Sequence, residues 1–385
     1  MPSRHLTAIP KYVFWELDAR RAALRATGRT LIDVGIGSPD QPIASVIVEA
    51  MQRAAAESAL SGYPHFRAHP AFTVAVAAYL ATRFGVEVNP TTELLALAGS
   101  KEGFAELVLA HVNPGDVVLI PAIYYPVYAR APQLAGATPV CVPILADGRL
   151  DLDAIAPTDL ARARMLVVNY PSNPTTATVP LQEYERLIEF ARRHALLLVS
   201  DLAYSELAFD GFVVPSVLQL PGAREVAVEL HTCSKSFSMA GVRIAFIAGN
   251  AAALSTLDQY RANIGYGVST LAQRAGEAAF THYASIVPSV VAEYRLRRDA
   301  MVAAFNANGW SVVAPNATMY LWLDVPDGYD DWGWVDALMQ GPGVVVTPGI
   351  AFGAAGAGHF RISLVQTAAA LVRAAALIAA VGSRE

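Results

Sequence analysis

The feature that most constrains this chain is a series of short apolar segments that alternate with helical patterns between about residues 94 and 250. The segments expected to be strands are 94–98, 117–120, 165–169, 196–201, 226–231 and 244–248. Strands that alternate with helices form a mostly parallel sheet with helices on its faces, and ligands bind beyond the carboxyl ends of such strands. The residues that end the strands are therefore the first candidates for chemistry.

The chain is long enough for two domains, because 385 residues exceed what one hydrophobic core usually supports. After the sheet region, a charged helical pattern at 292–308 leads into further strand patterns. These patterns lie at 319–325, 344–347 and 360–364. We expect an N-terminal arm (1–32) that packs on the small domain or on a partner, a large domain (33–280) and a smaller C-terminal α/β domain (281–385).

Charge and composition exclude several classes of protein. The 33 acidic residues against 28 Lys and Arg give a net charge of −5, and no basic run is dense enough to hold a nucleic acid backbone. The first 28 residues mix charges into their apolar positions, unlike a signal peptide, and no apolar run is long enough to cross a bilayer. Two cysteines, Cys141 and Cys233, provide neither a disulfide framework nor metal-ligand spacing. We expect a cytoplasmic protein with no nucleic acid or membrane partner and no metal.

Two polar segments follow expected strands. Gly99, Ser100 and Lys101 form a turn and a helix start, whose free N–H groups and dipole suit an anion, although such a turn is more often only a helix cap. Asn173 lies in a proline-stiffened loop after the 165–169 strand, a pattern that fits either a binding amide or an ordinary turn.

A carboxylate, Asp201, comes directly after a fully apolar strand. A carboxylate in that position is costly unless a cation or a hydrogen-bond donor pairs with it. A protonated pyridine nitrogen or a structural arginine would serve. Tyr204, three residues further on, could reach the same site.

The densest polar cluster, residues 232–243, follows the 226–231 strand. Lys235 lies among hydroxyl and apolar side chains with no acidic neighbour in sequence, which is compatible with a lowered amine pKa and a nucleophilic role. A solvated surface lysine is the alternative. Arg243, eight residues later, suits a phosphate. Arg361, at the start of an apolar strand, fits either a structural carboxylate or a substrate carboxylate.

Taken in this order, the segments resemble the class I/II aminotransferases of the pyridoxal 5′-phosphate (PLP) fold-type I group. The resemblance covers nearly the whole chain, and its most diagnostic part is Ser-Lys-Ser-Phe-Ser-Met-Ala-Gly-Val-Arg at 234–243. It implies an α/β fold, with a three-layer large domain around a mostly parallel sheet and a smaller α/β C-terminal domain. Segments 9–14 and 32–40 resemble the LL-diaminopimelate aminotransferase-like branch, which does not fix the substrate.

The resemblance implies transamination between an amino acid and a 2-oxo acid, with a donor of the diaminopimelate, alanine or aspartate type. Lys235 would carry PLP as a Schiff base and then move the proton between the substrate and the cofactor. Asp201 would keep the pyridine nitrogen protonated, Asn173 and Tyr204 would bind the ring oxygen, and Tyr125 would stack on the ring.

The resemblance also implies ligands for the phosphate and the substrate. The phosphate ligands would be Ser100, Lys101, Thr232, Ser234, Arg243 and, from a second subunit, Tyr63. A homodimer with shared active sites follows. Arg361 would bind the substrate α-carboxylate with help from Asn173 and the backbone of Gly37, and Tyr12 would line the substrate pocket.

Three positions depart from the family's commoner pattern. Thr176 replaces a usual glycine, Val242 a frequent tryptophan, and the segment 63–70 lacks a glycine-centred loop. The changes in 63–70 place His65, Phe66, Arg67 and His69 where they could approach a side-chain pocket. Two other functions use the same fold: a PLP-dependent β- or γ-lyase, and a non-enzymatic PLP-binding effector module.

Overall fold

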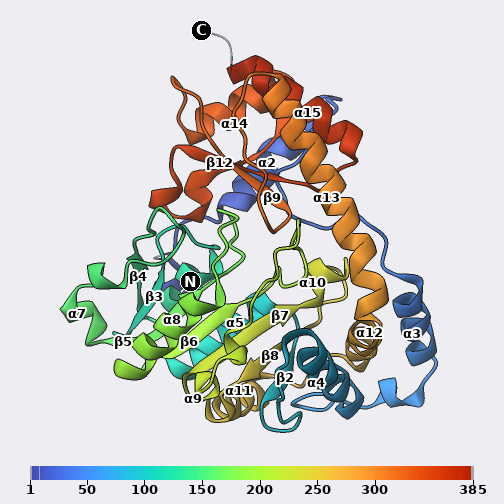
Figure 1. Cartoon of the computed structure of the whole chain (residues 1–385), viewed down its shortest axis with the longest axis vertical. Coiled ribbons are helices and arrows are strands. Elements are labelled where there is room, and N and C mark those ends of the chain that lie inside the picture. Colours follow the sequence, from blue (N-terminus) through green and yellow to red (C-terminus); the bar gives the residue numbers. More distant parts are fainter. Residues whose placement is uncertain (1, 8, 383–385) are drawn as a thin grey trace.

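The computed structural model describes residues 2–7 and 9–382 of the chain. Figure 1 shows a larger body around a wide central sheet and a smaller body that contains the C-terminal elements and the helix α2 (Val13–Ala26). In the described part of the chain, no helix is both long enough and apolar enough to cross a membrane.

The central sheet has seven strands in the order β2-β8-β7-β6-β5-β3-β4. Their bounds are β2 (Leu94–Leu97), β3 (Val117–Pro121), β4 (Thr138–Val142), β5 (Ala163–Val168), β6 (Leu197–Asp201), β7 (Ala227–Thr232) and β8 (Ala245–Gly249). Every neighbouring pair is parallel except those of β8, which runs antiparallel to both β2 and β7. The predicted mostly parallel sheet is confirmed.

Helices cover both faces of this sheet, as the three-layer prediction required. Alternate strand residues face opposite sides, so that Leu94 and Val117 belong to one core while Leu95 and Val118 belong to the other. One face is covered by α5 (Ser100–His111), α6 (Val127–Leu134) and α11 (Ala251–Ile264). The other is covered by α4 (Pro70–Phe84), α8 (Leu181–Arg193) and α12 (Thr270–Thr281), with α3 (Ser45–Ala55) packed on α12.

The smaller body begins with the long helix α13 (Tyr283–Ala307). It contains the antiparallel sheet β11 (Thr347–Pro348), β12 (His359–Ser363) and β9 (Tyr320–Asp324), together with α14 (Asp331–Gln340) and α15 (Ala368–Gly382). The remaining short helices are α1 (Arg4–Thr7), α7 (Pro157–Leu160), α9 (Ala223–Val226) and α10 (Cys233–Ser236), and five 3-10 turns lie at Ser58–Ser61, Leu152–Ala154, Val217–Gln219, Gly349–Phe352 and Ala354–Gly356.

Residues near the N-terminus join the smaller body. The strand β1 (Ile32–Asp33) pairs in parallel with β10 (Val344–Val345), and Arg20 of α2 forms an ion pair with Asp336 at 2.6 Å. The Arg20 guanidinium also lies 4.1 Å from the centre of the Trp332 ring. The start of the chain is therefore held against elements that lie more than 300 residues later in sequence.

Two details of the fold differ from the sequence-based expectation. The edge strand β4 was not expected, because its residues are mostly exposed or half-buried and so lack a continuous apolar pattern. The expected strand 344–347 splits in two, since β10 pairs with β1 whereas β11 pairs with β12. The chain changes sheets between them.

Candidate active site

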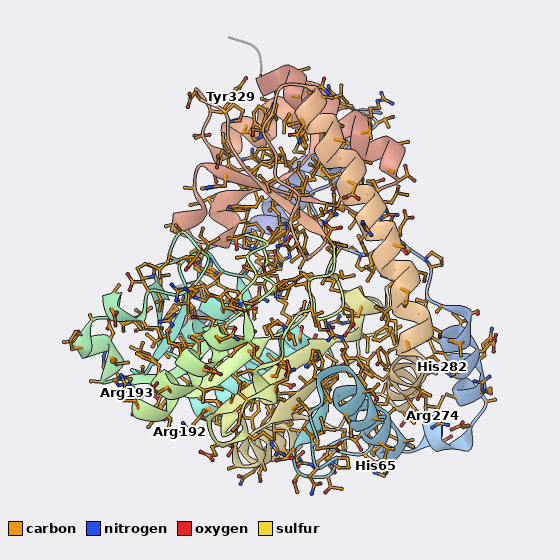
Figure 2. The ribbon with its side chains drawn as sticks, viewed as in Figure 1. His65, Arg192, Arg193, Arg274, His282 and Tyr329 are labelled. Atoms are coloured by element: carbon orange, nitrogen blue, oxygen red, sulfur yellow. The ribbon has the colours of Figure 1, made fainter. Side chains whose placement is uncertain are left out.

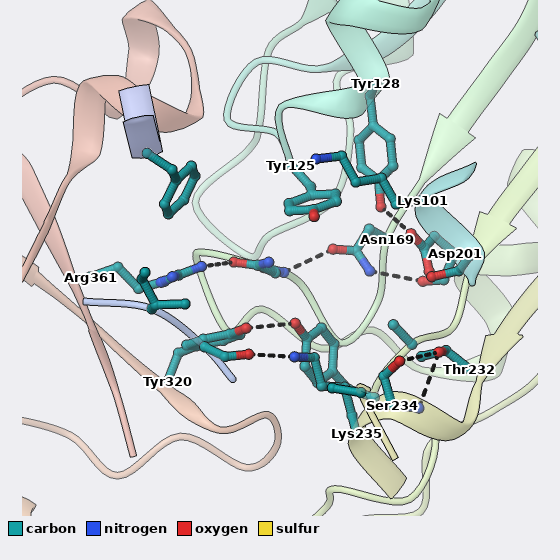
Figure 3. A pocket seen from close by; sticks show the side chains of 18 of the residues that line it. Lys101, Tyr125, Tyr128, Asn169, Asp201, Thr232, Ser234, Lys235, Tyr320 and Arg361 are labelled. Atoms are coloured by element: carbon teal, nitrogen blue, oxygen red, sulfur yellow. Dashed lines mark hydrogen bonds between the residues drawn. The ribbon is translucent and has the colours of Figure 1, made fainter. Parts of the chain in front are cut away.

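A cavity of about 350 Å³ lies at the carboxyl edge of the central sheet, where the smaller body meets it (Figure 3). Of the residues that the sequence singled out, those lining it are Tyr12, Gly37, Ser100, Lys101, Tyr125, Asn173, Asp201, Tyr204, Thr232, Ser234, Lys235, Arg243 and Arg361. Within one chain, Tyr63 does not line this cavity.

The sheet topology explains why these residues converge. The parallel strands β5, β6 and β7 end at one edge, and each is followed within a few residues by a polar side chain of the cavity: Asn173, Tyr204 and Lys235. Because β8 is antiparallel to both its neighbours, Arg243, which precedes β8, and Ser100, which follows β2, come to the same edge. The reversed strand β8 thus contributes Arg243 from its start, and β2, which runs in the same direction as β7, contributes Ser100 from its end.

Lys235 as a whole residue is half-buried, but its amine lies inside the cavity and is buried there. Its Nζ donates a hydrogen bond to the carbonyl oxygen of Gly37. Burial lowers the pKa of Lys235, and the nearby cations Arg361 and Arg243 lower it further, against an opposing contribution from Tyr320. No described carboxylate forms an ion pair with this amine. Lys235 is therefore a buried amine poised to lose its proton, and a solvated surface lysine does not fit.

Asp201 is buried and only half satisfied. Its Oδ2 accepts a hydrogen bond from the hydroxyl of Tyr128 at 2.6 Å, whereas its Oδ1 has no partner. Burial raises the pKa of Asp201 to about 6, although the Tyr128 hydrogen bond acts in the opposite direction. No described arginine or lysine pairs with it. An unpaired carboxylate oxygen at a cavity wall is suited to a positively charged N–H group of a bound molecule.

A chain of hydrogen bonds joins Asp201 to Arg361 (Figure 3). Asn169 Nδ2 donates to the Asp201 carbonyl at 2.8 Å, the Asn173 N–H donates to Asn169 Oδ1 at 2.8 Å, and Arg361 Nη1 donates to Asn173 Oδ1 at 2.7 Å. Through Asn169, this network ties the backbone at Asn173 to the backbone at Asp201, and the Asn173 side-chain oxygen is held by Arg361.

Arg361 is a buried cation without a carboxylate partner in the described chain. Its Nη2 donates to the Gly35 carbonyl at 2.9 Å, and its Nε has no partner. Its guanidinium carbon lies 4.2 Å from the ring centre of Tyr320 and 4.8 Å from that of Phe352. Of the two readings left open by the sequence, the structural carboxylate is excluded, so this arginine is available to a bound carboxylate.

The opposite end of the cavity is suited to an anion. Arg243 pairs with no described carboxylate and donates only to the Ala240 carbonyl, at 3.1 Å. Gly99 supports it: φ there is +114°, and a Cβ would lie 2.3 Å from Arg243 Nη2, so only glycine fits. The hydroxyl groups of Thr232 and Ser234 are hydrogen-bonded to each other at 3.0 Å beside it.

Two tyrosines of the site were missed by the sequence analysis. Tyr128 follows Tyr125 by three residues, and residues three apart at a helix start lie on one side, so this spacing could have indicated that both face the cavity. Tyr320 is the first residue of the mostly apolar strand β9, and nothing in the sequence distinguishes it from a core residue. The side chains of Phe14 and Ile36 and the amide of Asn169 also line the cavity.

The segment 63–70 does not approach the cavity within one chain. The ring of Tyr63 stacks on Tyr266 with 3.8 Å between ring centres, and Arg67 pairs with Asp258 at 3.0 Å. His65 lies at the lower surface, away from the smaller body (Figure 2). Within one chain these residues do not line the cavity, and an approach to the pocket of a second subunit stays a prediction.

This chain is similar to known proteins over most of its length. Residues 29–378 match the sequence profile of the family described as "Aminotransferase class I and II". LL-diaminopimelate aminotransferase 2 of Trichormus variabilis is 41% identical over 366 residues, 94% of each chain. LL-diaminopimelate aminotransferase of Desulforudis audaxviator is 41% identical over 374 residues, 97% of this chain and 95% of that protein.

Solved structures agree over the whole length. BacF of Bacillus subtilis superposes with a TM-score of 0.95 at 31% identity, covering 99% of this chain and 98% of that one. A probable N-succinyldiaminopimelate aminotransferase of Thermus thermophilus superposes with a TM-score of 0.90 at 35% identity, covering 96% and 100%. The three-layer body and the smaller C-terminal body are common to these proteins.

The burial of Asp201 predicts a pH dependence of stability in the ligand-free protein. Between pH 3.8 and about 6 the folded chain binds the Asp201 proton and the unfolded chain does not, so its free energy of unfolding falls as pH rises through this window. Across this pH window, the free energy of unfolding of the unsubstituted protein should fall by about 3 kcal/mol relative to that of Asp201→Asn. Urea denaturation at several pH values measures this loss. Tyr128→Phe should move the upper limit of the window to higher pH, because it removes the hydrogen bond that lowers the Asp201 pKa. Parallel stability curves for the unsubstituted and Asn proteins would contradict it.

Proposed function

Because the chain belongs to the class I and II aminotransferases, the PLP-dependent enzymes of fold-type I that transfer an amino group between an amino acid and a 2-oxo acid, we propose that this cavity is its catalytic site. The observation that carries the proposal is the arrangement of three buried charged groups without protein counterions: Lys235, Asp201 and Arg361. Each of them matches one part of a PLP–amino acid pair.

The residues present fit the cofactor. The unpaired Oδ1 of Asp201 is suited to the protonated pyridine nitrogen, and the pair of Asn173 and Tyr204 to the ring oxygen. Tyr125 is placed to cover the ring. The groups proposed to hold the phosphate are Ser100, Lys101, Thr232, Ser234 and Arg243. When bound, PLP supplies an electron sink for the electrons of the substrate Cα–H bond.

Lys235 is the proposed nucleophile and general base. Its lowered pKa favours the uncharged amine, which would hold PLP covalently and, when free, would take the proton from the substrate α-carbon. The same Nζ would return that proton to C4′ of the cofactor. Arg361 and Asn173 hold the α-carboxylate, so that the α-hydrogen faces this amine. Smaller-body residues beside them, Phe14 and Tyr320, exclude water from this side.

The donor is proposed to be an amino acid of the diaminopimelate type, because relatives at 41% identity bear that name. Alanine and aspartate remain the other donor types. Phe14 lines the part of the cavity nearest Arg361, whereas Tyr12 lies beside Lys101, whose Nζ donates to the Tyr12 hydroxyl at 3.2 Å. The lyase alternative is not favoured, because both of these relatives and the Thermus thermophilus structure bear the name of an aminotransferase.

We propose that the active form is a homodimer with shared sites. The Tyr63 ring is 77% exposed and is stacked on Tyr266, which is itself exposed, with Phe66 beside it. Exposed aromatic clusters of this kind are typical of protein interfaces. In the proposed dimer, Tyr63 reaches the phosphate site of the other subunit. The domain limits at residues 32 and 280 and a cytoplasmic location remain predictions from the sequence.

Lys235→Ala should abolish the covalent attachment of the cofactor. We expect loss of the visible band of bound PLP, no cofactor retained after borohydride reduction and denaturation, and a fall in transaminase activity of at least about a thousandfold. Lys101→Ala is the matched control, because it removes another cavity amine and should weaken cofactor affinity but leave the reducible link in place. Reducible attachment that survives in Lys235→Ala would refute the role of this lysine.

A half-reaction screen identifies the donor. Enzyme saturated with PLP is mixed with one amino acid at a time, in the absence of any 2-oxo acid, and the cofactor spectrum is followed by stopped flow. We expect LL-diaminopimelate to give the fastest conversion to the pyridoxamine form, and Arg361→Lys to slow it by about a hundredfold through lost bidentate contact. Faster conversion by alanine or aspartate would overturn the donor assignment, and steady ammonia release would favour a lyase.

Shared sites predict complementation between two inactive variants. A mixed dimer of a Lys235→Ala subunit and a Tyr63→Ala subunit contains one site with both residues intact. Co-expression should restore about a quarter of the activity, because half of random dimers are mixed and each has one intact site. Activity no greater than that of the Tyr63→Ala protein alone would show that Tyr63 does not act across subunits.

A further inference from the structure

The hydroxyl groups of Tyr320 and Tyr204 form a buried hydrogen bond of 2.9 Å inside the cavity (Figure 3). Tyr320 comes from β9 of the smaller body, whereas Tyr204 follows β6 of the central sheet. Both side chains are buried, and their rings meet edge to face with 5.6 Å between ring centres. This contact therefore joins the two bodies at the active site.

The position of the Tyr320 ring is fixed by its surroundings. Its hydroxyl end lies against Gly37, where a Cβ would be only 2.3 Å from the oxygen, so that no larger residue fits at position 37. Its face lies under the Arg361 guanidinium at 4.2 Å. One side chain thus supports both the carboxylate-binding arginine and the hydroxyl of Tyr204.

The number of protons in this pair limits what Tyr204 can do. A tyrosine hydroxyl has one proton to donate. If Tyr204 donates to Tyr320, it has nothing left for the ring oxygen of the cofactor, whereas if Tyr320 donates, the Tyr204 proton is free. In the ligand-free cavity either hydroxyl can donate in this bond. Once the Tyr204 proton goes to the ring oxygen of the cofactor, only Tyr320 can supply the proton between the two hydroxyl groups.

We propose that Tyr320 is a positioning residue that donates its hydroxyl proton to Tyr204 and thereby directs the single proton of Tyr204 toward the ring oxygen of PLP. This inference rests on the proposed catalytic site. It adds a residue that touches Tyr204 rather than the reacting atoms, and it makes the hydrogen bond to the cofactor depend on the smaller body.

Tyr320→Phe isolates the hydroxyl. It retains the ring, its contact with Gly37 and its stacking under Arg361, and it removes only the donor to Tyr204. The readout is the pH midpoint of the visible absorbance of bound cofactor. A hydrogen-bond donor to the ring oxygen stabilises negative charge there and lowers the pKa of the nearby Schiff-base nitrogen. Loss of that donor should raise the midpoint.

The expected result is an upward shift of about 0.5 to 1 pH unit in Tyr320→Phe, in the same direction as in Tyr204→Phe. The double variant should shift no further than Tyr204→Phe, because Tyr320 acts only through Tyr204. An unmoved midpoint in Tyr320→Phe, or additive shifts in the double variant, would overturn the proposal. Absence of a cofactor band in the unsubstituted protein would overturn the catalytic site itself.

A second variant separates positioning from packing. Tyr320→Leu removes the ring as well, so it should also raise KM for the amino acid through Arg361, by about tenfold. In Tyr320→Phe, KM should change less than twofold while kcat falls about tenfold. If Tyr320→Phe raises KM as much as Tyr320→Leu does, with kcat unchanged, the hydroxyl has no positioning role.

Discussion

Charged groups that are buried without counterions impose the main physical demand on this structure. Asp201 keeps one oxygen unpaired, and Lys235 and Arg361 meet only backbone carbonyls, an amide and aromatic rings. Such groups are costly to bury, so the rest of the fold must hold them in place. The two apolar cores on either face of the central sheet provide that support, and a ligand with complementary charges relieves the cost.

Several residues around the cavity have an unfavourable backbone conformation. Arg243 and Ser238 have φ values of +62° and +54°, in a backbone region that residues other than glycine rarely adopt. Thr176 also has φ of +62°, which explains why glycine is usual at this position in the family and shows that this chain accepts the threonine without losing the loop. Strain of this kind persists only where the surrounding structure determines the conformation.

Much of this structure could be predicted from the sequence, for an identifiable reason. Asn173, Asp201 and Lys235 each follow an apolar strand, and parallel strands bring their carboxyl ends to one edge. Tyr320 could not be found in this way, because a tyrosine within an apolar strand has the pattern of a core residue. Its role depends on Gly37 and Tyr204, which are distant in sequence and meet it only in the folded chain.

The helix α2 and the smaller body are joined by the ion pair between Arg20 and Asp336 and by the pairing of β1 with β10. The residues next to the proposed substrate, Tyr12, Phe14 and Arg361, therefore come from one body, and the groups next to the proposed cofactor come mostly from the other. A substitution in the smaller body can therefore change the surroundings of the proposed substrate without altering the sheet edge that would hold the cofactor.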